Sequence, residues 1–249
     1  MPNPRIAYDR LYGQMNMHDR PFGYSKDYFI WRASKIKGEI SKFVKKGLIL
    51  DIGGGFGIMA NFLPPSTLDN YINLDISIVM LRYSPHVNIC AAGEHLPFRD
   101  GIFDYVICSG ALECVYDKLL VLKESYRVLK SGGLLLLTTP RTGWIDDFRQ
   151  SPFVVFILVD WFINSFILKT KRRGGSPTPL PEGLKYEPSS EKWLKETIER
   201  IGFRVLRQWR ADNHVPWCKN GESKFWRWFA DRFVDPRKFG QSTCLVCSK

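Results

Sequence analysis

The chain of 249 residues, 45% of them apolar, is long enough to bury a sizeable core and fits one elaborated domain at least as well as two small ones. Its first residues, MPNPRIAYDRLYGQ, hold charges and no apolar stretch, so we expect no secretory signal and a cytoplasmic location. Cys244 and Cys247 are spaced C-x-x-C, but STCLVCS resembles a strand. A strand would place the two thiols on opposite faces, so we expect no metal site.

The net charge of +11 is unevenly distributed, because residues 141–249 carry +8 of it together with seven of the eight tryptophans. Such a surface suits a nucleic acid partner or an anionic membrane surface. A basic face that is merely solvated would look the same, so all three interpretations stay open.

Residues 1–47 precede the first predicted strand. The stretch YSKDYFIWRASKIKGEISKFVKK is typical of an amphipathic helix. Ahead of it, Tyr12, His18, Arg20 and Tyr24 have no evident structural role. We therefore expect an N-terminal helical flap over a site.

From Leu48 onward, short apolar runs alternate with helical segments, which is typical of a parallel α/β sheet. The helix predicted in DKLLVLKESYRVLK places Leu119, Leu122, Tyr126 and Leu129 on one face and stops at 131–133. The helix predicted in SSEKWLKETIERIG is capped by Ser189 or Ser190, ends at Gly202 and turns Trp193, Leu194, Ile198 and Ile201 inward. The predicted strands are LILDIG, NYINLD, VNICAAG (87–93), FDYVICSG (103–110), LLLLTTP (134–140), FRVLRQW and STCLVCS.

The run DIGGGFGIMA, residues 51–60, follows the first strand and is rich in glycine. Glycines let the backbone turn tightly and approach a ligand closely. A dinucleotide fingerprint would need a third glycine at Ile58, and no Gly-Lys-Ser/Thr follows, so neither nucleotide motif fits. The spacing that fits is D-x-G-x-G-x-G, from Asp51 to Gly57. Alone, this loop is weak evidence, and the alternative is a simple tight turn.

The loop does not stand alone, because three later segments continue the same pattern in order. They are NLDIS, GEHLPFRDGIFDYVICSGALECV and RVLKSGGLLLLTTPR. Together the four segments resemble class I S-adenosylmethionine-dependent methyltransferases, most closely the type 11 group that includes ubiquinone and menaquinone biosynthesis enzymes. The resemblance covers residues 45–141 well and 189–209 more loosely.

The resemblance implies an α/β fold: a Rossmann-like doubly wound sheet of about seven strands, mostly parallel with an antiparallel C-terminal strand. It implies one methyltransferase domain over 1–249. Its parts are a flap and helix at 1–47, a cofactor-binding core at 48–141, an insertion at 143–187, a core helix and strand at 188–211, a second insertion at 212–240 and a last strand at 241–249.

The implied cofactor is S-adenosyl-L-methionine, with Asp75 accepting both ribose hydroxyls. Ala92 stands where the family usually has the Asp that contacts adenine, so Glu94 or the backbone near Gly93 would substitute. Cys114 stands where His is common, and a small buried thiol explains it best. The expected cofactor-binding residues are Asp51, Gly53, Gly55, Gly57, Asp75, Glu94 and Ser109.

The sequence leaves three functions open. The first is methyl transfer to a small or lipophilic acceptor, the second is a tRNA or rRNA methyltransferase using the basic surface, and the third is a non-catalytic cofactor-binding partner subunit. A base is needed only if the acceptor must lose a proton. The candidates for that base are Tyr12, His18, Tyr24, Glu113 and His214. The oligomeric state is not predicted.

Residues 152–173 consist of an apolar run and a basic cluster that follows it, made of Lys169, Lys171, Arg172 and Arg173. The apolar part, Phe153–Leu168, is shorter than the ~20 residues that a membrane-spanning helix needs. An apolar helix beside a cationic cluster suits peripheral contact with an anionic membrane. A lid or a dimerisation helix packed on protein fits equally.

Overall fold

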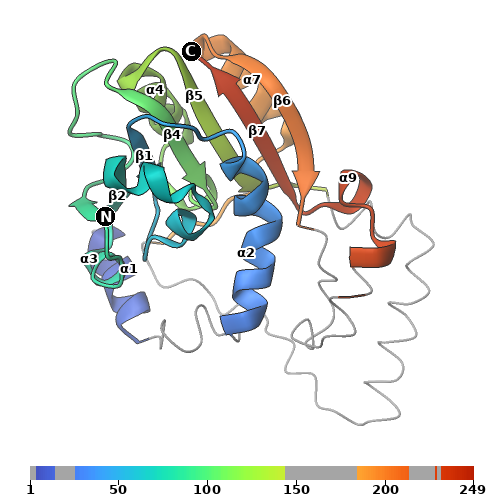
Figure 1. Cartoon of the computed structure of the whole chain (residues 1–249), viewed down its shortest axis with the longest axis horizontal. Coiled ribbons are helices and arrows are strands. Elements are labelled where there is room, and N and C mark those ends of the chain that lie inside the picture. The colour runs from blue at the N-terminus through green and yellow to red at the C-terminus, as the bar shows by residue number, and fades with distance from the viewer. Residues whose placement is uncertain (1–3, 15–25, 144–183, 213–227, 229–230) are drawn as a thin grey trace.

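The computed structural model of the chain describes residues 4–14, 26–143, 184–212, 228 and 231–249 (Figure 1). Seven strands form one sheet in the order β3-β2-β1-β4-β5-β7-β6. The pairings among β1 to β5 are parallel, whereas β7 runs antiparallel to both β5 and β6. This confirms the predicted α/β sheet. The strands are β1 (Ile49–Ile52), β2 (Tyr71–Asp75), β3 (Val87–Cys90), β4 (Phe103–Ser109), β5 (Leu129–Pro140), β6 (Arg204–Ala211) and β7 (Ser242–Ser248).

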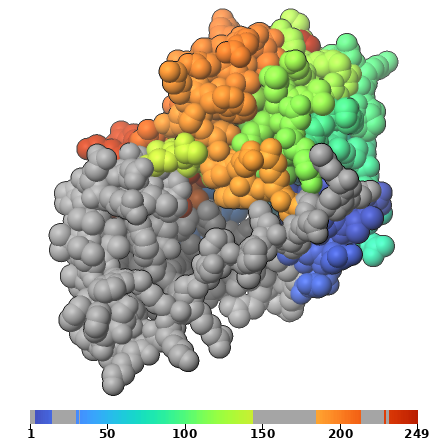
Figure 2. Space-filling model, turned by 180° about the vertical axis from the view of Figure 1, so that it is seen from behind, coloured from blue at the N-terminus to red at the C-terminus, as the bar shows by residue number. Residues whose placement is uncertain are grey.

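Helices cover both faces of this sheet. Helix α2 (Lys26–Ser41) crosses one face, as Figure 1 shows, and α4 (Lys118–Val128) and α7 (Glu191–Ile201) cover the other. From behind, the green α4 region and the orange α7 region lie side by side (Figure 2). The remaining elements are α1 (Pro4–Gly13), α3 (Ile78–Leu81), α9 (Pro236–Phe239) and the 3-10 helices η2 (Ile58–Phe62), η3 (Pro65–Asn70) and η4 (Leu112–Cys114).

The core consists of two hydrophobic clusters, one on each face of the sheet. On β5, Leu135 and Leu137 belong to the cluster under α4 and α7, whereas Leu136 belongs to the cluster under α2. The same alternation puts Cys247 in the first cluster and Cys244 in the second. The C-x-x-C thiols therefore lie on opposite faces, as predicted.

The predicted end of the helix in DKLLVLKESYRVLK is wrong. Helix α4 ends at Val128, and β5 begins at once with Leu129, which pairs with Phe103 of β4. The register then shifts, so that Tyr105 pairs with Leu134 and the glycine-containing segment between them belongs to the strand. Pairing with β4 thus replaces the last helical turn that the local pattern predicts.

Two predicted inward-facing residues point outward instead. Leu119 is 40% exposed, because the residues that α4 buries are Val121, Leu122, Ser125 and Val128, so that Leu122 of the predicted face is buried and Leu119 is not. Trp193 is 38% exposed, and the Lys118 ammonium lies 5.8 Å from the centre of its ring. The other predictions for α7 are confirmed, since the Ser190 hydroxyl caps its start and Gly202 ends it with φ +118°.

The two predicted insertions lie mostly outside the described residues, and the predicted membrane-surface segment 152–173 lies wholly outside them. Within the part of the chain that the structure describes, no helix has the length and apolar character needed to cross a membrane.

Candidate active site

The glycine loop after β1 turns against the carboxyl end of β2. Gly53 and Gly54 donate their N–H groups to the Leu74 carbonyl at 2.7 and 3.2 Å. Gly53 and Gly55 have φ values of +66° and +57°, a left-handed conformation that favours glycine. A Cβ on Gly53 would lie 2.4 Å from the Cβ of Ala111. The loop is therefore closed tightly against the segment that follows β4.

Asp75 is the last residue of β2 and faces this loop. Its Oδ2 accepts the N–H of Gly55 at 3.0 Å, and its Oδ1 accepts the N–H of Ser77 at 2.8 Å. Burial raises the pKa of Asp75 from 3.8 to about 6, while the two backbone donors oppose that rise. Each carboxylate oxygen has more than one lone pair, so Asp75 can also accept hydrogen bonds from a ligand.

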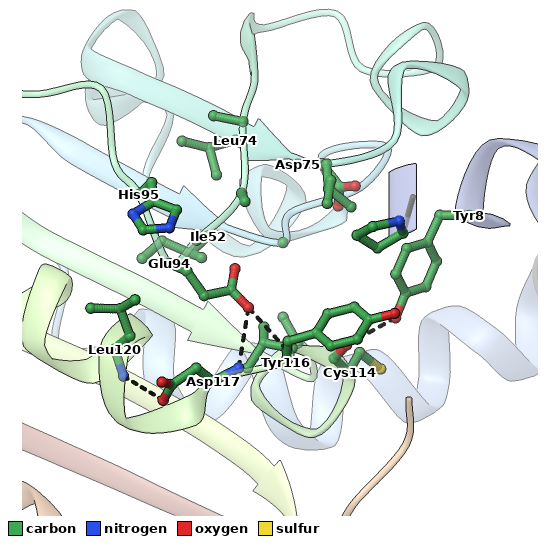
Figure 3. Close-up of a pocket in the computed structure, with 18 of the residues that line it drawn as sticks. Tyr8, Ile52, Leu74, Asp75, Glu94, His95, Cys114, Tyr116, Asp117 and Leu120 are labelled. Carbon is green, nitrogen blue, oxygen red and sulfur yellow. Dashed lines mark hydrogen bonds between the residues drawn. The ribbon is translucent and has the colours of Figure 1, made fainter. Parts of the chain in front are cut away.

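A first cavity of about 400 Å³ opens beside Asp75 (Figure 3). Ile52, Leu74 and Leu120 give it apolar walls. Glu94 also lines it and accepts the N–H of Tyr116 at 2.9 Å, which ties the chain after β3 to the chain after η4. The cavity is thus a mainly apolar slot with a carboxylate at its edge.

Helix α1 closes one side of the first cavity. Tyr8 and Tyr12 both line it, and their rings stack with centroids 5.8 Å apart. The Tyr8 hydroxyl donates to the Cys114 carbonyl at 3.0 Å, and Asp9 accepts the Ser77 hydroxyl at 2.6 Å. The predicted N-terminal flap is therefore, in its described part, a helix anchored at both sides of the cavity.

A second cavity of about 320 Å³ is lined by the glycine loop from Gly53 to Phe56. Its distinctive polar side chains come from separate elements: Lys37 from α2, Glu113 from η4 and Thr139 from β5. Five residues line both cavities, namely Tyr12, Gly53, Asp75, Gly110 and Cys114. The two cavities are therefore neighbours that share one wall.

Glu113 is only 4% exposed at the wall of the second cavity. Burial raises its pKa from 4.5 to about 7, and the Thr139 hydroxyl, which donates to its Oε2 at 3.2 Å, and the charge of Lys37 oppose the rise. The Lys37 ammonium donates to the Ser109 carbonyl at 3.2 Å, and burial lowers the pKa of Lys37. The cavity thus holds a carboxyl group that titrates near neutral pH.

Most of the residues predicted to bind the cofactor line these cavities. Gly53, Asp75 and Glu94 line the first, and Gly55 and Ser109 line the second. Two others are not among the lining residues. Asp51 accepts the Tyr71 hydroxyl at 2.5 Å beneath the loop, and a Cβ on Gly57 would lie 2.8 Å from the Ser84 hydroxyl.

Of the candidate bases, the structure brings Tyr12 and Glu113 to the second cavity. His18, Tyr24 and His214 lie outside the described residues. Sequence reasoning missed Tyr8, although it precedes Tyr12 by one helical turn, and it missed Lys37, for which no sequence signal was evident. Within the described ranges, no group of three or more His, Cys, Asp and Glu side chains could hold a metal ion.

Comparison with known proteins decides the family. Residues 50–137 match the methyltransferase domain family. The demethylmenaquinone methyltransferase of Corynebacterium urealyticum is 36% identical over 168 residues, which cover 64% of this chain and 70% of that relative. The chain belongs to the class I S-adenosylmethionine-dependent methyltransferases.

Other methyltransferases match shorter stretches or the fold alone. The ubiquinone/menaquinone biosynthesis C-methyltransferase of Haemophilus ducreyi is 55% identical over 123 residues, or 47% of this chain and 43% of that relative. An S-adenosylmethionine-dependent methyltransferase structure from Thermotoga maritima superposes with a TM-score of 0.57 at 17% identity, covering 99% of this chain and 100% of that one. The chain spans about half the length of several curated relatives, 43 to 55%.

The cavities of this methyltransferase fit S-adenosylmethionine, the cofactor of its family. The apolar walls of the first cavity suit a purine base, and Asp75 would hold the ribose hydroxyls. Gly53, Gly54 and Gly55 of the glycine loop line the second cavity, and a backbone without side chains there suits the amino acid end of the cofactor.

Proposed function

We propose that this methyltransferase transfers the methyl group of S-adenosylmethionine to a small or lipophilic acceptor bound in the second cavity. The observation that supports the proposal is that five residues line both cavities, so an acceptor in the second cavity would lie beside a cofactor that extends from the first cavity along the glycine loop. An acceptor held there would be close to the reacting end of the cofactor.

The bound cofactor supplies a methyl group on a sulfonium, which is already activated for transfer. The chain's own contribution is alignment and exclusion of water. Asp75 and the glycine loop would fix the cofactor, while Tyr8 and Tyr12 of α1 cover the first cavity. Ala33, Ile36 and Ile58 give the second cavity apolar walls that suit a lipophilic acceptor.

The names of the relatives are consistent with such an acceptor. Two act on quinone precursors, and two others are malonyl-[acyl-carrier protein] O-methyltransferases. These substrates are lipophilic or carrier-bound small groups. We therefore propose the same broad class for this chain, without choosing between them.

The test is incubation of the protein with methyl-labelled S-adenosylmethionine and fractionated cell extract. Label entering the small-molecule or lipid fraction supports the proposal. Label entering RNA, with binding that weakens steeply as salt is raised, would favour the RNA alternative. Cofactor binding without transfer to any fraction would favour a non-catalytic partner subunit.

Two arginines of β6 give the RNA alternative little support. On β6, Arg210 binds Glu191 through two hydrogen bonds of 3.0 and 2.7 Å. Arg207 lies over the rings of Phe43 and Trp209, at 5.7 and 5.1 Å from their centroids. Both arginines thus have partners within the chain.

A further inference from the structure

Glu113 is a buried carboxyl group that alignment of the cofactor does not require. It sits in η4, directly after β4, and lines the second cavity rather than the first. Its carboxylate receives a side-chain hydrogen bond from Thr139, and its backbone carbonyl accepts the N–H of Glu187 at 2.7 Å. The chain therefore holds this acid firmly in the compartment proposed for the acceptor.

We propose that the acceptor reacts through an ionisable hydroxyl oxygen of the phenol or enol type, and that Glu113 takes the proton of that hydroxyl. The inference rests on the proposed function and narrows it to O-methylation. Thr139 is then a positioning residue, because its hydroxyl holds one carboxylate oxygen of Glu113.

Methyl transfer to such a hydroxyl moves one proton and one methyl group. The acceptor O–H bond breaks and its proton moves to a carboxylate oxygen of Glu113. The acceptor oxygen forms the new bond to the methyl carbon, and the bond from that carbon to sulfur breaks with its electron pair remaining on sulfur. The products are a methyl ether or enol ether, a neutral thioether and a protonated Glu113, which releases its proton to solvent afterwards.

Three other acidic groups that line the second cavity, Cys114, Tyr12 and Asp75, suit this role less well. Burial raises the pKa of Cys114 to about 12 and raises the pKa of Tyr12 well above its usual value, so both keep their protons at neutral pH. Asp75 is already engaged by two backbone N–H groups. Glu113, with a pKa near 7, exchanges a proton where a general base works best.

Several charged and titratable groups surround Glu113 and would influence its titration. Lys37 on α2 and Lys118 on α4 lower its pKa through their charges. It in turn raises the pKa of three neighbours on other segments, namely Tyr12, Cys108 and Cys114. Two cations on other elements thus favour the ionised form of Glu113, and its charge acts on groups beyond η4.

The first experiment compares wild type with Glu113→Gln, using phenol, 4-nitrophenol and aniline as acceptors and methyl-labelled cofactor. With phenol, the substitution should lower kcat by roughly 10²- to 10⁴-fold, because a base is lost. With 4-nitrophenol at about pH 8, where its hydroxyl is already ionised, the loss should be under about tenfold. Glu39→Gln, which removes an exposed carboxylate on α2, is the matched control.

A second experiment needs no turnover. In urea unfolding, the wild-type free energy of unfolding should fall as pH rises from about 5 to about 7, because the unfolded chain releases the Glu113 proton while the folded chain retains it. Glu113→Gln should lose that part of the slope. In Thr139→Val, loss of the hydroxyl donor should move both this slope and the acidic limb of the pH–rate profile to higher pH.

The outcomes separate the two proposals. Methyl transfer to aniline but to neither phenol, or an equal loss with both phenols, overturns the role of Glu113 while the proposed function stands. If none of the three probes is methylated and only an extract fraction accepts label, two results also overturn the role of Glu113. One is an N- or S-methyl product, and the other is an unchanged rate in Glu113→Gln. An O-methyl product lost in Glu113→Gln supports it. Absence of transfer to every probe and fraction refutes both proposals.

Discussion

At the scale of single residues, Asp75 is the side chain on which cofactor affinity should depend most. Replacing it with Ala removes charge-assisted hydrogen bonds worth about 1.5–3 kcal/mol each, so affinity should fall roughly tenfold or more. Calorimetry with S-adenosylhomocysteine measures this loss. Asp69→Ala, which removes a carboxylate that lines neither cavity, is the control, and an unchanged affinity in folded Asp75→Ala would contradict the assignment.

Asp75 should also make the affinity for the cofactor depend on pH. The pKa of Asp75 is raised to about 6 by burial, and the ribose hydroxyls require the ionised form. Affinity should therefore be constant well above pH 6 and fall by up to about tenfold per pH unit below it. Titrations from about pH 5 to pH 8 test this. A profile identical to that of Asp75→Asn, which cannot ionise, would refute it.

At the scale of elements, the glycine loop should tolerate no side chain at Gly55. Its φ of +57° is unfavourable for other residues, and a Cβ there would lie 3.0 Å from the Met80 methyl group. Gly55→Val should lose about 1–2 kcal/mol of stability and also bind the cofactor more than about tenfold more weakly.

Gly132→Val is the matched control for that prediction. Gly132 has a similar φ of +76°, but a Cβ added to it would meet nothing within 4 Å, and it lines neither cavity. It should lose comparable stability and keep full cofactor affinity. If Gly55→Val also keeps full affinity, the loop is only a turn.

Helix α1 should act as a cover that slows release of the cofactor. Asp9 anchors it through the Ser77 hydroxyl at 2.6 Å and the Val79 N–H at 3.2 Å, at the start of α3. Asp9→Ala should increase the dissociation rate of the cofactor about tenfold, since hydrogen bonds to a charged group are lost. Stopped-flow measurements compare it with Asp69→Ala, and equal dissociation rates would refute the role of α1.

At the scale of the whole molecule, stability should depend on β7, which joins β5 to β6 and is buried on both faces. Leu245 is 1% exposed in the cluster under α4 and α7, so Leu245→Ala should lose about 2–5 kcal/mol in urea unfolding. Leu206→Ala on β6, where Leu206 is 49% exposed, should change stability by less than about 0.5 kcal/mol. Similar losses in both variants would contradict this description of the core.

The sequence alone determined the sheet and the family, and it predicted a cofactor site at the end of the first two strands. Apolar runs such as Leu134–Leu137 can be satisfied only by burial on both faces, and a glycine loop placed directly after such a run is a local signal. Asp75 was predictable for the same reason, because the end of a parallel strand fixes where its last side chain lies.

Only the tertiary structure decided which distant residues share the second cavity. Lys37, Glu113 and Thr139 are separated by 26 or more positions, and no local pattern relates them. It also decided that α4 ends at Val128, because pairing of Leu129 with Phe103 outweighs one further helical turn. Local sequence fixes periodicity and turns. Long-range pairing and packing, which depend on partners far along the chain, fix where elements end and which side chains meet.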